Sequence, residues 1–153
     1  MHALIAAVFL AQALGVPPQP SCDGNPSKEH PGYKTQAGWA ITAIDAPKEL
    51  AVEFLCKGSE GLIVLQQVQS RTSDGMPVWK ILAKKKIKLA KGEGLLTVST
   101  CKVGGEPSDE VVPLGRYSKE GAAIITRAFR ANRAKETFEV ISPSTVECEV
   151  EGD

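Results

Sequence analysis

Apolar and polar residues alternate along much of the chain, which is the pattern of β-strands that bury one face. The segments "LIVLQQVQS" (62–70) and "MPVWKIL" (76–82) flank a Ser-Asp-Gly turn and therefore predict a β-hairpin. A second turn, "KGEG" (91–94), leads into a further predicted strand, "LLTVSTCKV" (95–103). Two short strands are predicted near the end of the chain, "TFEVI" (137–141) and "TVECEV" (145–150).

The segment "ELAVEFLCKG" (49–58) is compatible with two structures. Val52, Phe54 and Cys56 alternate as strand residues do. A helix also fits, because Leu50 and Phe54 recur at helical spacing. We favour the strand for residues 49–57.

One helix is expected, at about residues 118–133. Ser118 is a suitable N-cap, and Ala122, Ile125 and Phe129 recur at the spacing of one helix face. The predicted class is therefore α+β: a mostly antiparallel β-sheet with one main helix, stapled by disulfides.

The segment "WKILAKKKIKLAKGEG" (79–94) has lysines mainly at even positions and apolar residues mainly at odd positions. This period of two predicts a strand with one face in water. The odd positions expected to face inward are Trp79, Ile81, Ile87 and Leu89. Lys85 breaks the pattern, which predicts a bulge or strand break between Ala83 and Lys86.

The N-terminal part predicts a signal peptide over residues 1–15. Its apolar run "ALIAAVFL" (3–10) is too short to span a bilayer, and small residues follow it, with cleavage expected after Ala13 or Gly15. Residues 16–36 contain five prolines and are expected to form an arm. Residues 37–153 then form a single domain. No later apolar stretch is long enough to cross a membrane.

The net charge places a limit on the binding partners. The chain carries 18 Lys and Arg against 18 Asp and Glu, so no overall field draws it to polyanions, and nucleic acid is not the expected partner. A local anion site is still conceivable if its basic groups share one face. The candidate anion-binding residues are Lys84, Lys86, Lys88, Arg127, Arg130 and Arg133.

The histidines restrict the available catalysis. His2 lies in the expected leader and His30 in the arm, so a histidine-based triad would require His30 to fold back onto the domain. No phosphate-binding loop or metal-ligand spacing occurs, and we expect no cofactor, no metal site and no catalytic residues. A carboxylate-dependent hydrolase is an alternative without a nominated pair; the acids available include Glu53, Glu60, Asp74, Asp109 and Glu110.

The chain has four cysteines, Cys22, Cys56, Cys101 and Cys148. An even number in an exported protein predicts disulfides, and the sequence leaves all three connectivities open.

The second half of the chain, about residues 77–152, resembles a group of small uncharacterised exported proteins of proteobacteria. The shared pattern is "PVWKIL", "GLLTVSTCKVGGEPSDEVV" and "RAFRANRAKETFEVISPSTVECEVEG". The resemblance implies that Cys101 pairs with Cys148, which leaves Cys22 and Cys56 to pair or to remain free. It carries no activity that can be transferred.

These observations favour a periplasmic or secreted domain without enzymatic activity. Its expected partner is an unidentified protein or a component of the cell envelope. An anion-binding module and a carboxylate-dependent hydrolase are the alternatives.

Overall fold

The computed structural model describes residues 17–41 and 47–150. Strands make up 60% of these residues and a short 3-10 segment 2%, so the domain is almost entirely β. The predicted α+β class is therefore wrong. The expected signal peptide, residues 1–15, lies outside the described residues.

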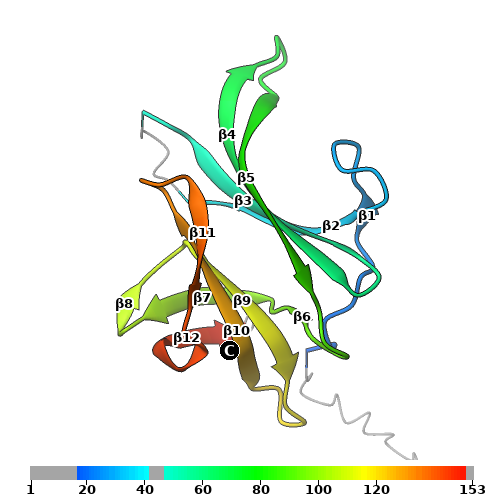
Figure 1. Ribbon diagram of the computed structural model, residues 1–153, viewed down its shortest axis with the longest axis vertical. Helices are drawn as coiled ribbons and strands as arrows, with labels where there is room; N and C mark the ends of the chain where they lie inside the picture. Colours follow the sequence, from blue (N-terminus) through cyan, green and yellow to red (C-terminus); the bar gives the residue numbers. More distant parts are fainter. Residues whose placement is uncertain (1–16, 42–46, 151–153) are drawn as a thin grey trace, which may run out of the picture.

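The strands form three antiparallel sheets (Figure 1). The first has the order β1-β2-β3-β4-β5, with β1 (Asn25–Pro26), β2 (Lys34–Ala40), β3 (Leu50–Lys57), β4 (Glu60–Arg71) and β5 (Pro77–Lys88). The second has the order β11-β10-β9-β6, with β6 (Gly94–Leu95), β9 (Val111–Tyr117), β10 (Ala123–Asn132) and β11 (Thr137–Ile141). The third has the order β12-β7-β8, with β7 (Val98–Val103), β8 (Glu106–Pro107) and β12 (Val146–Val150), and the 3-10 segment η1 (Pro143–Thr145) precedes β12.

The main core lies between the first and second sheets. Val52 and Phe54 of β3 and Ile63 of β4 are buried in one cluster with Leu114 of β9 and Phe129 of β10. Each such side chain contributes roughly 1.5–3 kcal/mol when it leaves water. The strand prediction for residues 49–57 is confirmed, because β3 presents alternate residues to this core.

The predicted helix at 118–133 is replaced by a turn and the strand β10. Ser118 is a turn residue and not a helix N-cap: its backbone N–H donates to the carbonyl of Ala122, and its Oγ accepts from the N–H of Ala122. Gly121 has φ of 88°, which glycine adopts without strain and which closes the turn.

Two properties of β10 explain why its sequence looks helical. The strand is buried on both faces: Phe129 packs in the main core, whereas Ala128 packs in a second cluster with Cys101 and Val111. In addition, a bulge at Thr126 shifts the alternation by one residue. Apolar positions on two faces, offset by a bulge, produce a spacing that matches one face of a helix.

A bulge also changes the prediction for β5. The register shift falls at Leu82, just before the predicted range of 83–86. Ile87 faces the core, as expected, but Trp79 and Ile81 lie on the opposite face of the sheet, so their predicted inward orientation is wrong. Lys85 does lie on the core side, where its Nζ is 5.5 Å from the centroid of the Phe129 ring. This cation–π contact accommodates the charge.

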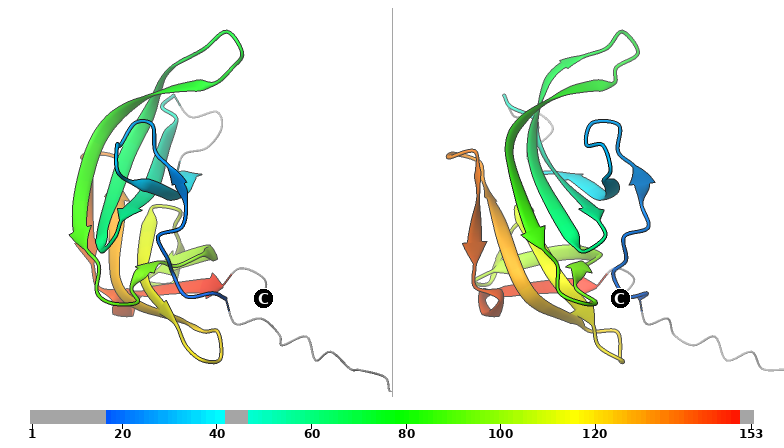
Figure 2. Two further views of the ribbon diagram at one scale, coloured as in Figure 1. Left: turned by 90° about the vertical axis from the view of Figure 1, so that its right-hand side faces the viewer. Right: turned by 45° about the vertical axis from the view of Figure 1, so that its right-hand side comes forward.

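The proline-rich segment runs beside the strongly curved first sheet (Figure 2). Its β1 pairs with β2, which already begins at Lys34. Tyr33 packs on a small buried cluster of Leu55, Leu62 and Val64. A disulfide between Cys22 and Cys56 of β3 ties the segment to the sheet.

Gln19 fixes the start of this segment to β9. Its side-chain amide donates to the carbonyl of Tyr117 at 2.9 Å and accepts from the N–H of Tyr117 at 3.0 Å. We expect Gln19→Glu to lose the first hydrogen bond, because a carboxylate cannot donate. The carboxylate oxygen and the Tyr117 carbonyl oxygen would repel each other and turn the side chain away, which should speed hydrogen exchange at the Tyr117 amide about five- to tenfold, equivalent to roughly 1 kcal/mol. Gln69→Glu, at an exposed position of β4, is the control. Unchanged exchange at Tyr117 would contradict this role for Gln19.

Candidate functional site

A cleft of about 690 Å³ separates β2 of the first sheet from β7 of the third sheet. This volume lies in the range of ligand-binding sites. Its lining residues come from β2, from β6 and the residue that follows it, from the first part of β7, from the end of β8 and the segment after it, and from the start of β9. They include the apolar side chains Trp39, Leu96, Val98, Val111 and Pro113 and the polar side chains Ser99, Thr100, Ser108 and Asp109.

One wall of the cleft is the unpaired edge of β2. The strand β1 pairs with β2 only at Lys34 and Thr35, so the edge is open from Ala37 to Ala40. The N–H of Ile41 donates to the carbonyl of Leu50 at 3.0 Å. Ile41 and Leu50 therefore form a hydrogen-bonded pair, and such pairs alternate along an antiparallel ladder with pairs that are not hydrogen-bonded. Gly38 and Ala40 belong to the second kind, so their backbone polar groups point away from β3 and toward this edge.

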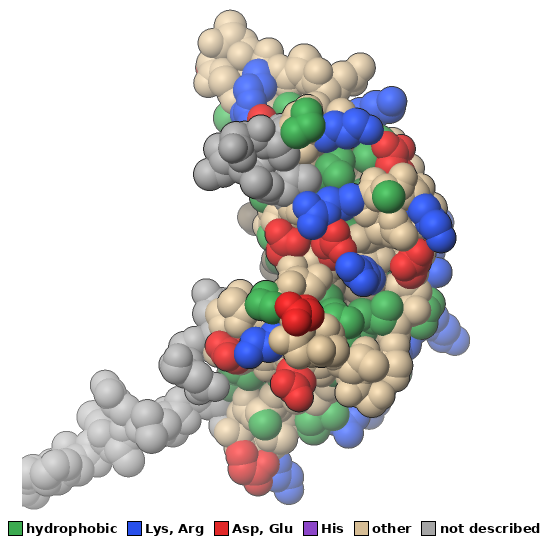
Figure 3. All heavy atoms as spheres, turned by 90° about the vertical axis from the view of Figure 1, so that its left-hand side faces the viewer, with side chains coloured by type: hydrophobic (Ala, Val, Ile, Leu, Met, Phe, Trp, Pro, Cys, Tyr) green, Lys and Arg blue, Asp and Glu red, His purple; other side chains and the backbone are tan. Residues whose placement is uncertain are grey.

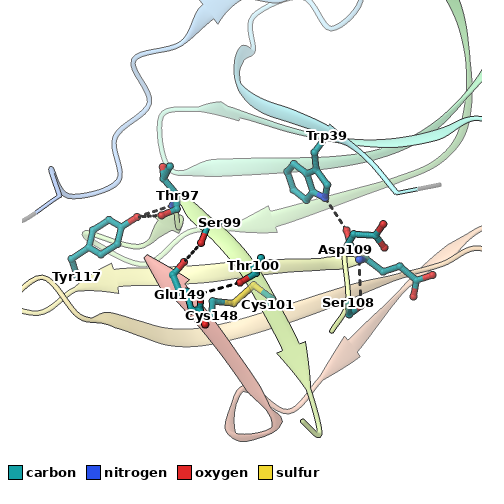
Figure 4. The surroundings of a disulfide bond; sticks show 11 residues. Trp39, Thr97, Ser99, Thr100, Cys101, Ser108, Asp109, Tyr117, Cys148 and Glu149 are labelled. Atoms are coloured by element: carbon teal, nitrogen blue, oxygen red, sulfur yellow. Dashed lines mark hydrogen bonds between the residues drawn. A yellow bond between two sulfur atoms is a disulfide. The ribbon is translucent and has the colours of Figure 1, made fainter. Parts of the chain in front are cut away.

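The opposite wall is the first half of β7. The strand β8 pairs with β7 only at Lys102 and Val103, so the β7 edge at residues 98–100 has no partner strand on that side. The other side of β7 pairs with β12, and the Cys101–Cys148 disulfide joins the two strands at a directly opposed pair (Figure 4). This wall is therefore held rigidly.

A hydrogen bond at the cleft joins β2 to the segment before β9. The indole Nε1 of Trp39 donates to the backbone carbonyl of Asp109 at 3.0 Å, and the indole points from β2 across to the segment before β9 (Figure 4). Near the disulfide, Thr100 donates from Oγ1 to Oε2 of Glu149 at 3.3 Å. Asp109 and Glu149 thus place carboxylates close to the cleft, and Asp109 is the one charged residue among the described residues that line it.

A second cleft, of about 620 Å³, adjoins the first along β2, since Ala37 and Leu95 line both. It lies between the proline-rich segment and the β5–β6 loop, next to the Cys22–Cys56 disulfide. Its one acidic lining residue is Glu93, which accepts hydrogen bonds from Arg127.

The two disulfides confirm the expectation that the cysteines are oxidised in pairs. Cys101 is joined to Cys148, which is the pair that the resemblance implied, and Cys22 is joined to Cys56. The Cys101–Cys148 bond connects β7 to β12 beside the first cleft. The Cys22–Cys56 bond connects the proline-rich segment to β3 beside the second cleft.

The structure does not bring the six candidate anion-binding residues to one face. Lys84 and Lys86 pair with Val64 and Leu62, on the face of the first sheet that turns away from β10, and Lys88 follows them at the end of β5. Arg127 contacts Glu93 and the carbonyl of Lys88. Both Arg130 and Arg133 contact Glu110.

The three arginines belong to ion pairs. On the face of the domain shown in Figure 3, basic and acidic side chains are interspersed. Burial by itself raises the pKa of Glu110, but the hydrogen bonds from Arg130 and Arg133 outweigh it and hold that pKa below its ordinary value of 4.5. The same balance of burial against the Arg127 hydrogen bond lowers the pKa of Glu93. These arginines therefore serve neighbouring carboxylates.

The carboxylates that were available for a hydrolase are dispersed. Glu53 accepts from Thr35, Glu60 from Tyr33 and Asp74 from Thr72, while Asp109 and Glu110 lie near Arg133. Neither of the two clefts has two acidic residues among its described lining. Within residues 17–41 and 47–150, no group of three or more His, Cys, Asp or Glu could hold a metal ion.

The residues that form the cleft between β2 and β7 were not identified from the sequence. Nothing in "QAGWA" (36–40) indicates that the edge of this strand is unpaired. The run of small residues around Trp39 is the one available signal, because small side chains leave a backbone edge accessible.

Comparisons with protein-family models, curated proteins and solved structures found no match to this chain.

Proposed function

We propose that this protein is an exported binding domain that acts through contact with another protein and has no catalytic activity of its own. The observation that carries the proposal is the cleft between β2 and β7, which combines apolar side chains, hydroxyl groups and open strand edges. Apolar surface with a few placed polar groups is typical of recognition sites.

The two disulfides support export, because disulfides typically form and persist in oxidising compartments such as the periplasm or the extracellular space. In the part of the chain that the structure describes, no helix has the length and apolar character needed to cross a membrane.

The carboxylate hydrolase and the anion binder receive less support. A hydrolase of this type needs two acids facing one substrate, and the described acids accept hydrogen bonds in separate places. An anion site needs unpaired basic groups on one surface, and the arginines already bind carboxylates.

Crosslinking from the cleft tests the proposed function. We expect a photoreactive amino acid at the exposed position Ser99 to form a covalent adduct with a protein in an extract of exported proteins from the source organism. The matched control carries the same group at the exposed Lys119, in the β9–β10 turn. Mass spectrometry should find the partner only with the Ser99 variant. No adduct, or the same adducts from both positions, would contradict binding of a protein at this cleft.

A further inference from the structure

We infer that the cleft binds an extended polypeptide segment, which adds to the first sheet as a strand next to β2. This inference rests on the proposed function and specifies its partner: an extended segment with apolar side chains and a nearby lysine or arginine. The mode is β-strand addition, in which backbone hydrogen bonds provide affinity and alternate side chains provide specificity.

The backbone of β2 supplies the first argument. The N–H and carbonyl groups of Gly38 and Ala40 point away from β3, and no other described residue forms a hydrogen bond with them. Both residues are exposed. A strand edge with unsatisfied donors and acceptors is a template for another strand, and natural proteins usually protect such edges with charges, prolines or a covering element.

The edge of β5 in the same sheet is protected against strand addition, whereas the edge of β2 is not. The opposite edge of the first sheet, on β5, carries Lys84, Lys86 and Lys88, which discourage association. The open part of β2 has no charged residue between Ala37 and Ala40. The same sheet thus protects one edge and leaves the other accessible.

The shape and charge of the cleft supply the second argument. An added strand would lie between β2 and the unpaired half of β7, and apolar side chains such as Leu96, Val98 and Pro113 line this space. Asp109 is the charged residue among the described lining residues; its side chain is 57% exposed and lies 4.0 Å from Arg133, a distance at which the carboxylate remains accessible to a second cation. A positively charged side chain on the segment would therefore be favoured near it.

A proline scan of the two edges tests the inference. The probe is the peptide most strongly enriched from a phage-displayed library of random linear peptides selected on the oxidised wild-type protein. We expect Gly38→Pro to weaken binding about tenfold, because proline removes the N–H group that points outward from the β2 edge. The hydrogen bonds between β2 and β3 do not involve this N–H and are kept. Lys84→Pro is the matched control, since the N–H of Lys84 also points outward, from the β5 edge. Asp109→Asn should weaken binding of a basic peptide roughly two- to fivefold.

Hydrogen exchange provides a measurement that needs no variant. Adding the selected peptide to the wild-type protein should slow exchange at the Gly38 and Ala40 amides and leave the Lys84 and Lys86 amides unchanged. Failure to enrich any peptide, equal binding by Gly38→Pro and Lys84→Pro, or unprotected Gly38 and Ala40 amides would each overturn the inference. A protein crosslinked from Ser99 whose binding is insensitive to Gly38→Pro would leave the proposed function in place and refute strand addition.

Discussion

Replacing both Cys101 and Cys148 with alanine is expected to lower the free energy of unfolding by about 3–4 kcal/mol. The two residues are 47 positions apart, so the bond closes a long loop and restricts the unfolded chain. Their strands also support one wall of the cleft, and Cys101 is buried with Val111, Ala128 and Val146. Urea denaturation of the oxidised wild-type protein and the double variant measures the difference.

The double variant Cys22→Ala/Cys56→Ala is the matched comparison. Its loop spans 34 residues, so the expected loss from loop closure differs from that of the first pair by only roughly 0.3 kcal/mol. The local effects should differ, because this variant releases the proline-rich segment and the other loosens β7 against β12. If Cys101→Ala/Cys148→Ala unfolds at the same urea concentration as the wild-type protein, the predicted stabilisation is wrong.

Replacing Glu110 with glutamine is expected to lower the free energy of unfolding at pH 7 by about 2 kcal/mol. The carboxylate is 11% exposed and accepts charged hydrogen bonds from Arg130, at 2.9 Å, and from Arg133. An amide keeps the shape but loses the charge, and its nitrogen is repelled by the guanidinium groups. The arginines are about half exposed, so they can turn to water, which keeps the loss below that of a fully buried pair.

The pH dependence of this loss follows from the lowered pKa of Glu110. Burial acts to raise that pKa, but the hydrogen bonds from Arg130 and Arg133 place it below its ordinary value of 4.5 in the folded protein. The stabilisation is therefore present above about pH 4.5 and disappears as the pH falls through the folded pKa. The difference between wild type and Glu110→Gln should shrink over this acidic range in urea denaturation. Glu120→Gln, at an exposed turn position, is the control, and a difference that grows with acidity would contradict this account.

Alternation of residue types predicted the ranges of several strands well. The strands β3, β4 and β7 lie close to the predicted ranges, because each contributes alternate residues to a buried cluster. The failures occur at bulges. An extra residue at Thr126 makes β10 resemble a helix, and one at Leu82 turns Trp79 to the opposite face. A bulge depends on the partner strand, so a period counted along one segment does not reveal it.

The candidate site could not be predicted from the sequence for the same reason, because it depends on how distant segments pair. Which edge of a sheet remains unpaired depends on strand order, and strand order is set by contacts between distant segments. The sequence identified the cysteines, and it indicated that a histidine triad would require His30 to fold back onto the domain; in the structure His30 is buried, at 4% exposure. The sequence did not place Gly38 opposite Ser99, because 61 positions separate them and only the packing of the first sheet against the third brings them to one cleft.

The order of the disulfides has a consequence for how the chain would be oxidised during the export that we propose. Cys22 joins Cys56 and Cys101 joins Cys148, so the first cysteine of the chain bonds to the second and the third bonds to the fourth. In a chain that crosses a membrane N-terminus first, the first pair emerges completely before either cysteine of the second pair. An oxidase that joins cysteines in order of emergence would make both native bonds directly, and maturation would not depend on an enzyme that reshuffles incorrect ones.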